Sequence, residues 1–277
     1  MAGTLWLVGT PIGNLGDAAE RAAGTLGAVD VIACEDSRRT RKLLSHLGVS
    51  GRRLVSFNEG NERRQVPFLL EKLRAGHDVA VVSDAGMPGL SDPGYRLVVA
   101  CVAEDIPVDV VPGPSAAIAA LVISGLPTAR FAFEGFFPRK GGERRTRLLA
   151  LAEDPRTLVL FESPRRLRAL LADALEVLGD RRAAVVRELT KVHQEVRRGR
   201  LSELATGLAE EVLGEVVVVI DGAPDSGPAD LEALGDRVQA LTEGGVPRKE
   251  AAARVAQEAG LSRRALYEAS LRRRPPG

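Results

Sequence analysis

Carboxylate side chains follow two of the short apolar runs in the N-terminal half of the chain. Glu35 and Asp36 come after the run 29–34, and Asp84 follows the run 79–83. Adjacent residues of a strand point to opposite faces, so at most one of Glu35 and Asp36 faces a given cleft. A carboxylate at such a place can accept a proton from a substrate hydroxyl. Asp36 can alternatively cap the helix that begins after it.

Two further places in the chain carry candidates for proton transfer. Glu59 belongs to a group of polar residues that crowds the end of the apparent strand 54–57 and could bind a ribose or the edge of a base. The group is Asn58, Glu59, Asn61 and Glu62. A desolvated lysine can act as a base or pair with a nucleic-acid backbone, which makes Lys191 a candidate. Asp36, Lys191 and Glu59 are therefore the candidate catalytic residues, and the sequence does not select among them.

A glycine-rich loop joins the first apolar run, Leu5–Val8, to an alanine-rich segment that begins after Asp17. Gly9, Pro11 and Gly13 in this loop would allow the backbone to approach a ligand closely. Their spacing does not match G-x-G-x-x-G, and the Lys-Ser/Thr pair of a P-loop is missing. The loop is either a ligand-binding loop of another kind or a plain tight turn between strand and helix.

Seven further motifs follow this loop in order, and together they are more specific than any one alone. They are ACEDSRRT at 33–40, SFNEGNE at 56–62, SDAGMPGLSDPG at 83–94, VPGPSA at 111–116, FESPRR at 161–166, RELTK at 187–191 and GE at 214–215. This set resembles the tetrapyrrole-methylase superfamily over residues 4 to about 222. Within it, the chain resembles the branch that methylates the ribose 2′-oxygen of a cytidine in 16S ribosomal RNA.

The resemblance implies a cofactor, a cleft and an assembly. The cofactor would be S-adenosylmethionine, bound between two α/β units, and the protein would be a homodimer acting on 16S rRNA within the small ribosomal subunit. Methyl transfer requires donor and acceptor to be held in line and a proton to be removed from the incoming hydroxyl. The implied cofactor-binding residues are Pro11, Gly13, Asp84, Ala85, Gly86, Met87, Ser115, Ala116, Leu189 and Gly214, the last two on the adenine side.

Arginine and lysine cluster in two segments, although the net charge is only +1. Nine of these residues lie between 138 and 168 against four acidic ones, and five arginines lie between 262 and 277. Clustered arginines can neutralise phosphates, but they can equally form a solvated surface. The candidate RNA-binding residues are Arg38, Arg39, Arg139, Lys140, Arg144, Arg145, Arg263 and Arg264.

Composition is that of an ordinary globular protein, with 277 residues, 45% hydrophobic and 27% charged. Cys34 and Cys101 lie in apolar runs, which suits buried free thiols better than a disulfide or a metal site. The histidines lack ligand spacing, so no metal is expected. No signal peptide is evident and no run of 18 apolar residues occurs, so we expect a cytoplasmic protein without a membrane anchor.

Apolar runs alternate with helical patterns, which predicts an α/β fold with mixed, largely parallel sheets. The N-terminal unit, 1–112, has predicted strands 5–8, 29–34, 54–57, 79–83 and 108–111 and helices 17–26, 38–47, 62–75 and 93–104. The second unit, 113–222, has predicted strands 130–136, 157–161, 183–187, 194–198 and 216–220 and helices 115–124, 141–153, 164–178 and 201–211.

The C-terminal tail, 229–277, follows a linker rich in glycine and proline and contains helical patterns only. Segments 230–243 and 248–259 are predicted helices, and Ser262 would cap a third. This arrangement is compatible with a helix-turn-helix, and equally with a plain helical bundle.

Two other functions remain compatible with the residues. A tetrapyrrole (precorrin or uroporphyrinogen) C-methyltransferase would share both units, but its first loop usually reads G-x-G-x-G-D, and a basic helical tail is unusual there. A non-enzymatic nucleic-acid-binding protein would use the tail as its active part. Binding of a methyl donor separates the latter from both enzymes.

Overall fold

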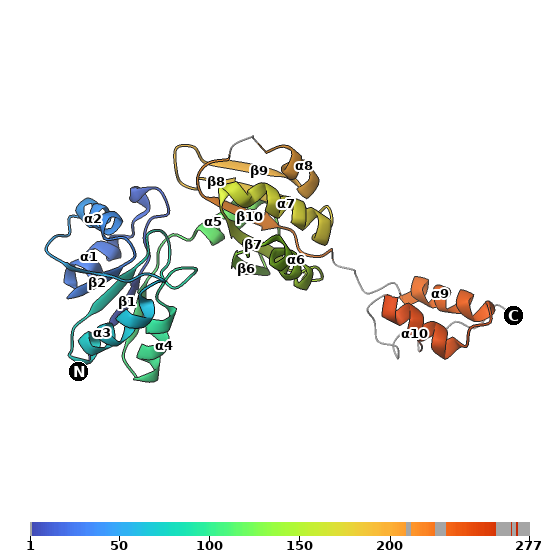
Figure 1. Cartoon of the computed structure of the whole chain (residues 1–277), viewed down its shortest axis with the longest axis horizontal. Coiled ribbons are helices and arrows are strands. Elements are labelled where there is room, and N and C mark those ends of the chain that lie inside the picture. Colours follow the sequence, from blue (N-terminus) through green and yellow to red (C-terminus); the bar gives the residue numbers. More distant parts are fainter. Residues whose placement is uncertain (1, 209–211, 225–230, 259–266, 268–269, 271–277) are drawn as a thin grey trace. The chain divides into compact units, whose positions relative to one another are not determined.

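Contacts divide the chain into two compact units, 1–222 and 223–277. The structure is a computed structural model and describes residues 2–208, 212–224, 231–258, 267 and 270 (Figure 1). The first unit contains two five-stranded sheets, which are joined by the segment after Val111. The predicted domain boundary at 112/113 falls between these sheets and stays a prediction.

The first sheet is entirely parallel, with strand order β3-β2-β4-β1-β5. Each strand is a four-residue apolar or mixed run, and the three central strands are mostly buried. All five carboxyl ends therefore lie along one edge, where ligands of parallel sheets bind. The strands are Leu5–Val8 (β1), Val31–Cys34 (β2), Arg53–Ser56 (β3), Val79–Val82 (β4) and Val108–Val111 (β5).

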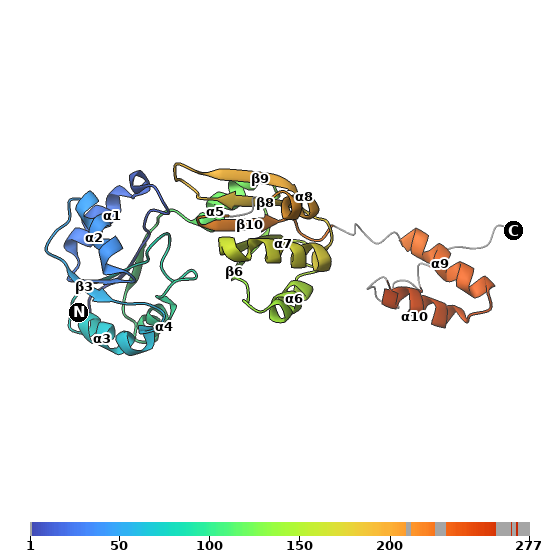
Figure 2. The ribbon, with the colours of Figure 1, turned by 45° about the horizontal axis from the view of Figure 1, so that its top comes forward.

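Helices cover both faces of this sheet (Figures 1 and 2). Leucines of Glu20–Ala28 (α1) and Ser37–His46 (α2) pack with one face of the strands. Leucines of Glu62–Arg74 (α3) and Tyr95–Ala103 (α4) pack with the other. Burial on both faces explains why the central strands are near-continuous apolar runs.

The second sheet is mixed, with order β6-β7-β10-β8-β9. Its β6·β7 pair is parallel, and the other three pairs are antiparallel. Over both sheets five of the eight pairs are parallel, so the predicted α/β class with mixed, largely parallel sheets is confirmed. The strands are Phe131–Phe136 (β6), Thr157–Glu162 (β7), Arg182–Arg187 (β8), Glu195–Arg200 (β9) and Val216–Ile220 (β10).

Two separate apolar cores hold the second sheet between its helices. One core combines the sheet with Gly141–Ala150 (α6), Pro164–Leu178 (α7) and Leu201–Thr206 (α8). The other combines it with Ala116–Ser124 (α5) and with Ile12 of the glycine-rich loop. Through Ile12 the first loop of the chain packs directly against the second sheet.

Every predicted strand is present, and the differences concern element ends. The helix predicted from residue 17 begins at Glu20, because Leu15–Asp17 forms a 3₁₀ turn (η1) whose preceding Asn14 side chain accepts the Gly16 N–H. The helix predicted over 201–211 ends at Thr206 before Gly207, and 209–211 lie outside the described residues. The helix predicted over 141–153 ends at Ala150.

The second unit contains Leu231–Glu243 (α9) and Arg248–Glu258 (α10). They enclose a small core that includes Val238 and Val255. Both helices were predicted. The third helix, predicted after Ser262, lies outside the described residues.

Candidate active site

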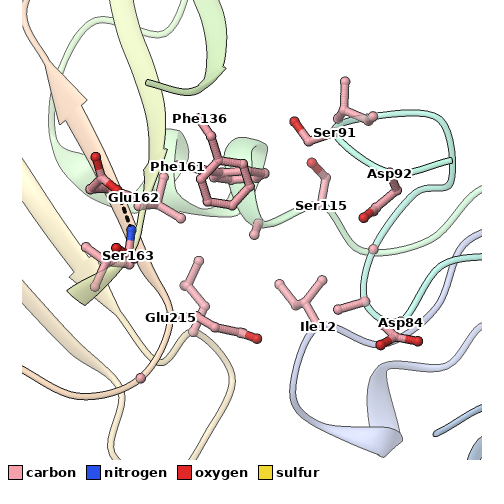
Figure 3. Close-up of a pocket in the computed structure, with 18 of the residues that line it drawn as sticks. Ile12, Asp84, Ser91, Asp92, Ser115, Phe136, Phe161, Glu162, Ser163 and Glu215 are labelled. Atoms are coloured by element: carbon pink, nitrogen blue, oxygen red, sulfur yellow. Dashed lines mark hydrogen bonds between the residues drawn. The ribbon is translucent and has the colours of Figure 1, made fainter. Parts of the chain in front are cut away.

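A cavity of about 460 Å³ lies between the two sheets of the first unit (Figure 3). The first sheet contributes the segments that follow β2 and β4, and the second contributes the ends of β6 and β7 and the start of β10. This size is typical of a small-molecule site. Eight of the ten residues predicted to bind the cofactor line it: Asp84, Ala85, Gly86, Met87, Ser115, Ala116, Leu189 and Gly214.

The loop after β4 is fixed by hydrogen bonds to the glycine-rich loop. The Thr10 N–H donates to the Gly86 carbonyl over 2.9 Å, and the Gly86 N–H donates back to Thr10 over 3.1 Å. The Ser83 hydroxyl donates to the same Gly86 carbonyl over 3.1 Å. Gly86 has a φ of 86°, which favours glycine. The backbone at 84–87 is thereby held at the cavity wall.

The segment that enters α5 reaches the cavity at the start of a helix, where the first N–H groups have no partner within the helix. Ser115 is the residue before α5, and its side chain makes no capping hydrogen bond. Ser115 and Ala116 both line the cavity. Free N–H groups at a helix start attract a carboxylate or phosphate. This end of the cavity can therefore hold the carboxylate of an amino acid moiety.

The opposite wall of the cavity is formed by residues in the left-handed backbone region, which residues other than glycine rarely adopt. Glu188 and Thr190 have φ values of 51° and 63°, and Gly214 has 88°. The Glu188 carboxylate accepts the Glu215 N–H over 2.8 Å and the Lys191 ammonium over 2.9 Å. Such outliers persist only where surrounding contacts hold them, and they concentrate at ligand sites. They set the backbone of Leu189 and Gly214 against the cavity.

Pro11 and Gly13 line a second cavity, of about 310 Å³, instead of the first. The two cavities share five lining residues, among them Ile12, Arg39 and Asp84, so they adjoin. A side chain at position 13 would collide with the 189–191 backbone and side chains. Gly13 is therefore needed for the close approach of this loop to that wall.

The three predicted proton acceptors lie outside the first cavity. Asp36 caps α2 by accepting the Arg38 N–H over 2.8 Å, and the hydrogen-bonded Arg38 guanidinium holds the pKa of Asp36 below its usual range. Glu59 is exposed and lines neither cavity. These positions do not support Asp36 or Glu59 as the base.

Lys191 lines the second cavity and pairs with two carboxylates, those of Glu188 and Glu215. Although burial lowers its pKa, the hydrogen bonds that its ammonium donates to Glu188 and Glu215 leave the pKa of Lys191 raised above its usual value. The Lys191 side chain is thus a protonated, ion-paired ammonium at neutral pH, and a protonated amine cannot accept a proton.

Sequence reasoning missed several residues of the first cavity. Of the adjacent pair that follows β2, Glu35 lines it and Asp36 does not, because Asp36 caps α2. Burial, then the charges of Glu35 and Asp84, raise the pKa of Asp92 to about 7. Asp92 lies in the motif 83–94, but the sequence analysis predicts a site role only for Asp84, Ala85, Gly86 and Met87 of that motif. Phe136 and Phe161, with ring centroids 5.5 Å apart, add an aromatic wall. Of these two residues, only Phe161 lies in one of the motifs, FESPRR at 161–166.

The predicted RNA-binding residues other than Arg144 and Arg145 fall into three groups. Arg38 and Arg39 are exposed on α2 beside the cavities, with Arg38 on Asp36 and Arg39 3.5 Å from Asp84. Arg139 and Lys140 are exposed before α6. Arg263 and Arg264 lie outside the described residues.

Arg144 must be removed from the predicted RNA-binding set. Its side chain is 7% exposed and donates to the Asp173 carboxylate over 2.6 Å. Arg145, half exposed, donates to the other oxygen of Asp173 over 2.9 Å. A buried, paired guanidinium cannot reach a phosphate, so Arg144 serves the α6–α7 packing. The cluster of arginines in sequence did not reveal that partner, which is 29 residues away.

Both cysteines are buried free thiols, as predicted. Within the described part of the chain, no group of three or more metal-binding side chains occurs. No described helix has the length and apolar character needed to cross a membrane.

A family model described as tetrapyrrole (corrin/porphyrin) methylases matches residues 4–205. The chain is 50% identical over 276 residues to ribosomal RNA small subunit methyltransferase I of Mycobacterium tuberculosis (strain CDC 1551 / Oshkosh), covering 99% of this chain and 96% of that protein. It is 45% identical over 273 residues to the protein of the same name from Synechocystis sp. (strain ATCC 27184 / PCC 6803 / Kazusa), covering 97% and 98%.

A solved structure shares the fold. Uroporphyrin-III C-methyltransferase from Thermus thermophilus, complexed with S-adenyl homocysteine, superposes with a TM-score of 0.55 at 24% identity. The match covers 78% of this chain and 96% of that one.

Proposed function

The chain belongs to the tetrapyrrole (corrin/porphyrin) methylase family, and we propose that it is an S-adenosylmethionine-dependent methyltransferase of small-subunit ribosomal RNA. The methyl acceptor is the ribose 2′-oxygen of a cytidine in 16S rRNA, and the enzyme acts in the cytoplasm. The main observation in support of this function is that eight residues from four separate motifs line one cavity. The name of the full-length relatives supports the RNA substrate.

The residues present fit the proposed methyl donor, which supplies a methyl group on a good leaving sulfur. The N–H groups at the start of α5 suit its carboxylate, and backbone at Leu189 and Gly214 suits its adenine. Carboxylates of Asp84 and Glu215 face the same space and favour a positive charge there. Ile12 and the aromatic wall exclude water around the transferred group.

Two measurements test this function. Calorimetry with S-adenosylmethionine or S-adenosylhomocysteine should show one site per chain. Tritium from labelled donor should pass to small ribosomal subunits that lack the modification, and not to mature subunits. Transfer to a reduced porphyrin instead would establish the C-methyltransferase alternative, and folded protein that binds neither ligand would leave only a nucleic-acid-binding function.

For the RNA contact, we propose the basic face of α2 beside the second cavity. Arg39 lines both cavities and Lys42, one helical turn later, lines the second. The Lys42 ammonium has no ion pair with the described residues. Arg39 has only a long contact, of 3.5 Å, to Asp84. By contrast, the segment 138–168 has shorter ion pairs, of 2.5–3.2 Å, at Lys140, Arg145, Arg147, Arg156 and Arg166. In that segment, Arg139 and Arg165 are exposed and remain candidates for contacts to RNA phosphates.

The Arg39→Ala/Lys42→Ala variant should weaken binding to small subunits and make it less sensitive to salt. Each lost phosphate contact removes about 0.7 from the slope of log K against log salt on single-stranded RNA, so the double variant should lose roughly 1.4. Filter binding between 50 and 200 mM salt, a range chosen to resolve the slope, measures it. Lys72→Ala, at the far end of α3, is the matched control. An unchanged slope would show that this face does not contact phosphates.

We also propose a homodimer, formed through the outer face of α4. Tyr95, Val99 and Val102 are 70%, 48% and 64% exposed and recur at the spacing of one helix face. The neighbouring edge strand β5 exposes Val110. A second copy of the chain, related by a two-fold axis, would cover this patch, and such pairs are the commonest assembly.

The Val99→Asp variant should dissociate this dimer. A two-fold interface contains the substitution twice, and burying unpaired charges should weaken association on the order of 100-fold or more. Light scattering should give twice the chain mass of 29.4 kDa for the wild type and one chain mass for the variant. Leu149→Asp, exposed on α6, is the control and should stay dimeric. A wild-type mass of one chain would contradict the dimer, and a dimeric Val99→Asp protein would contradict this interface.

A further inference from the structure

We propose that Glu188 is a positioning residue for the methyl donor, because its carboxylate joins the turn after β8 to the start of β10 and so fixes one wall of the cavity. The inference rests on the proposed function, which takes S-adenosylmethionine as the ligand of this cavity. Leu189 and Gly214 line the cavity on the adenine side, and Glu188 stands behind them without lining it.

A single carboxylate oxygen of Glu188 holds both segments of this wall. The Glu188 N–H donates to the Glu215 carbonyl over 3.0 Å, which extends the pairing of β8 with β10 by one residue. The Glu188 Oε1 atom accepts the Glu215 N–H over 2.8 Å and the Lys191 ammonium over 2.9 Å. The Lys191 N–H donates to the Glu188 carbonyl over 3.1 Å and closes the turn. The two segments are therefore joined at one side chain.

The turn has a backbone that does not hold itself in place. Glu188 and Thr190 have φ values of 51° and 63°, which are unfavourable for residues with a Cβ atom. Leu189, between them, is buried in the same apolar core as Ile12. Contacts from outside the turn must hold such a conformation, and the bond from the Glu215 N–H to the Glu188 carboxylate is one of them.

The Glu188 side chain also accounts for the glycine at position 214. Gly214 has a φ of 88°, and a Cβ atom there would overlap the Cγ atom and the carboxylate of Glu188. The Glu188 side chain therefore packs directly on the backbone of Gly214, which lines the cavity on its other side. Gly214 leaves the room that the Glu188 carboxylate needs.

The same turn meets the glycine-rich loop of the first sheet. A Cβ atom at Gly13 would lie 2.7 Å from both Lys191 Cγ and Thr190 Oγ1. The hydrogen bond from Lys191, then the one from the Glu215 N–H, hold the pKa of Glu188 below its usual range, so its carboxylate is charged at neutral pH and keeps Lys191 paired. Loss of this carboxylate should loosen the wall and its contact with the loop together.

A wall that is ordered before the donor arrives favours binding, because the donor does not have to order it. Leu189 and Gly214 offer the adenine side their backbone groups, which keep their places only while the turn keeps its shape. The reacting sulfur and methyl group lie away from the adenine. Loss of the Glu188 carboxylate should therefore weaken donor binding and leave the transfer step of a bound donor nearly unchanged.

The Glu188→Met variant tests the inference, because methionine keeps the length of the side chain and removes the acceptor. Calorimetry should show that it binds S-adenosylmethionine about 10–100-fold more weakly than the wild type. Glu188→Gln keeps an acceptor oxygen and should recover most of the affinity. The matched control is Asp154→Leu, because Asp154 also accepts a backbone N–H and a guanidinium, from Arg156, but lines neither cavity. This control should bind the donor like the wild type.

Steady-state methyl transfer to unmodified small subunits separates positioning from a general loss of structure. In Glu188→Met the KM for the donor should rise by a factor similar to the loss of affinity, and kcat at saturating donor should stay within about three-fold of the wild type. The KM for the subunits should not change. A general loss of structure would lower kcat and weaken both substrates.

The Gly214→Ala variant examines the contact itself. It should displace the Glu188 carboxylate and weaken donor binding, and Glu188→Met/Gly214→Ala should bind no more weakly than Gly214→Ala, because both substitutions break one contact. Additive losses in the double variant would overturn the inference. So would Glu188→Met with donor affinity within about two-fold of the wild type, a kcat that falls with the affinity, or an equal loss in Asp154→Leu. Wild-type protein that binds no donor would instead contradict the proposed function itself.

Discussion

The Asp173→Ala variant should unfold with a free energy about 3–5 kcal/mol lower than the wild type. Asp173 is 8% exposed on the side chain and holds the buried Arg144 through a 2.6 Å hydrogen bond. Its other oxygen holds Arg145. Removing the carboxylate leaves a buried guanidinium without a partner, and that uncompensated charge causes most of the loss. Urea unfolding followed by circular dichroism measures it.

Two companion variants separate burial from simple charge loss. Arg145→Ala removes a half-exposed partner and should lower the free energy of unfolding far less than Asp173→Ala, because solvent screens that ion pair. Arg144→Met/Asp173→Leu replaces the buried pair by apolar groups and should recover much of the stability. If Asp173→Ala unfolds like the wild type, Arg144 is not buried as described and its role as an RNA contact returns.

The Gly113→Ala variant should bind S-adenosylmethionine on the order of 100-fold more weakly. A Cβ atom at Gly113 would lie 2.8 Å from the backbone C and Cα of Gly9, so one of the two loops must move. Ser115 and Ala116, two and three residues later, line the cavity and would move with it. Displacement by about an ångström is enough to spoil a preorganised site. Calorimetry on folded protein measures the loss.

Gly24→Ala is the matched control for this substitution. Nothing lies within 4 Å of a Cβ at Gly24, which stands inside α1. Alanine there should stabilise the helix by roughly 0.5–1 kcal/mol and leave donor affinity unchanged. Equal donor affinity in wild type and Gly113→Ala would show that the contact between the two glycine loops does not shape the site.

The fold could be predicted because its strands are short apolar runs with clear boundaries. Val79–Val82 and Val216–Ile220 are buried on both faces, and such runs need no partner information to be identified. Element ends were harder to predict, since the 3₁₀ turn at Leu15–Asp17 depends on a hydrogen bond that the Asn14 side chain accepts from the Gly16 N–H. Strand pairing in the second sheet, where β10 lies between β7 and β8, depends on contacts that no local pattern contains.

The sequence predicted those parts of the candidate site whose shape depends on backbone conformation. Glycine and proline motifs identified the segments around Asp84 and Ser115 because those residue types allow close approach. The roles of the carboxylates were not predictable, because they depend on which of these groups are paired in space. Asp36 turns out to cap a helix, whereas Asp92 faces the cavity without a described partner. Likewise, Arg144 finds Asp173 only when α6 and α7 pack together.

Mass mapping of ribose methylation in 16S rRNA tests the central claim most directly. The RNA would come from cells that lack this protein and from the same cells carrying the wild-type gene. We expect one cytidine to be lighter by a single methyl group on its ribose in the first RNA and to be restored by the wild-type gene. A 16S rRNA with the same ribose methylation in both would contradict the proposed function.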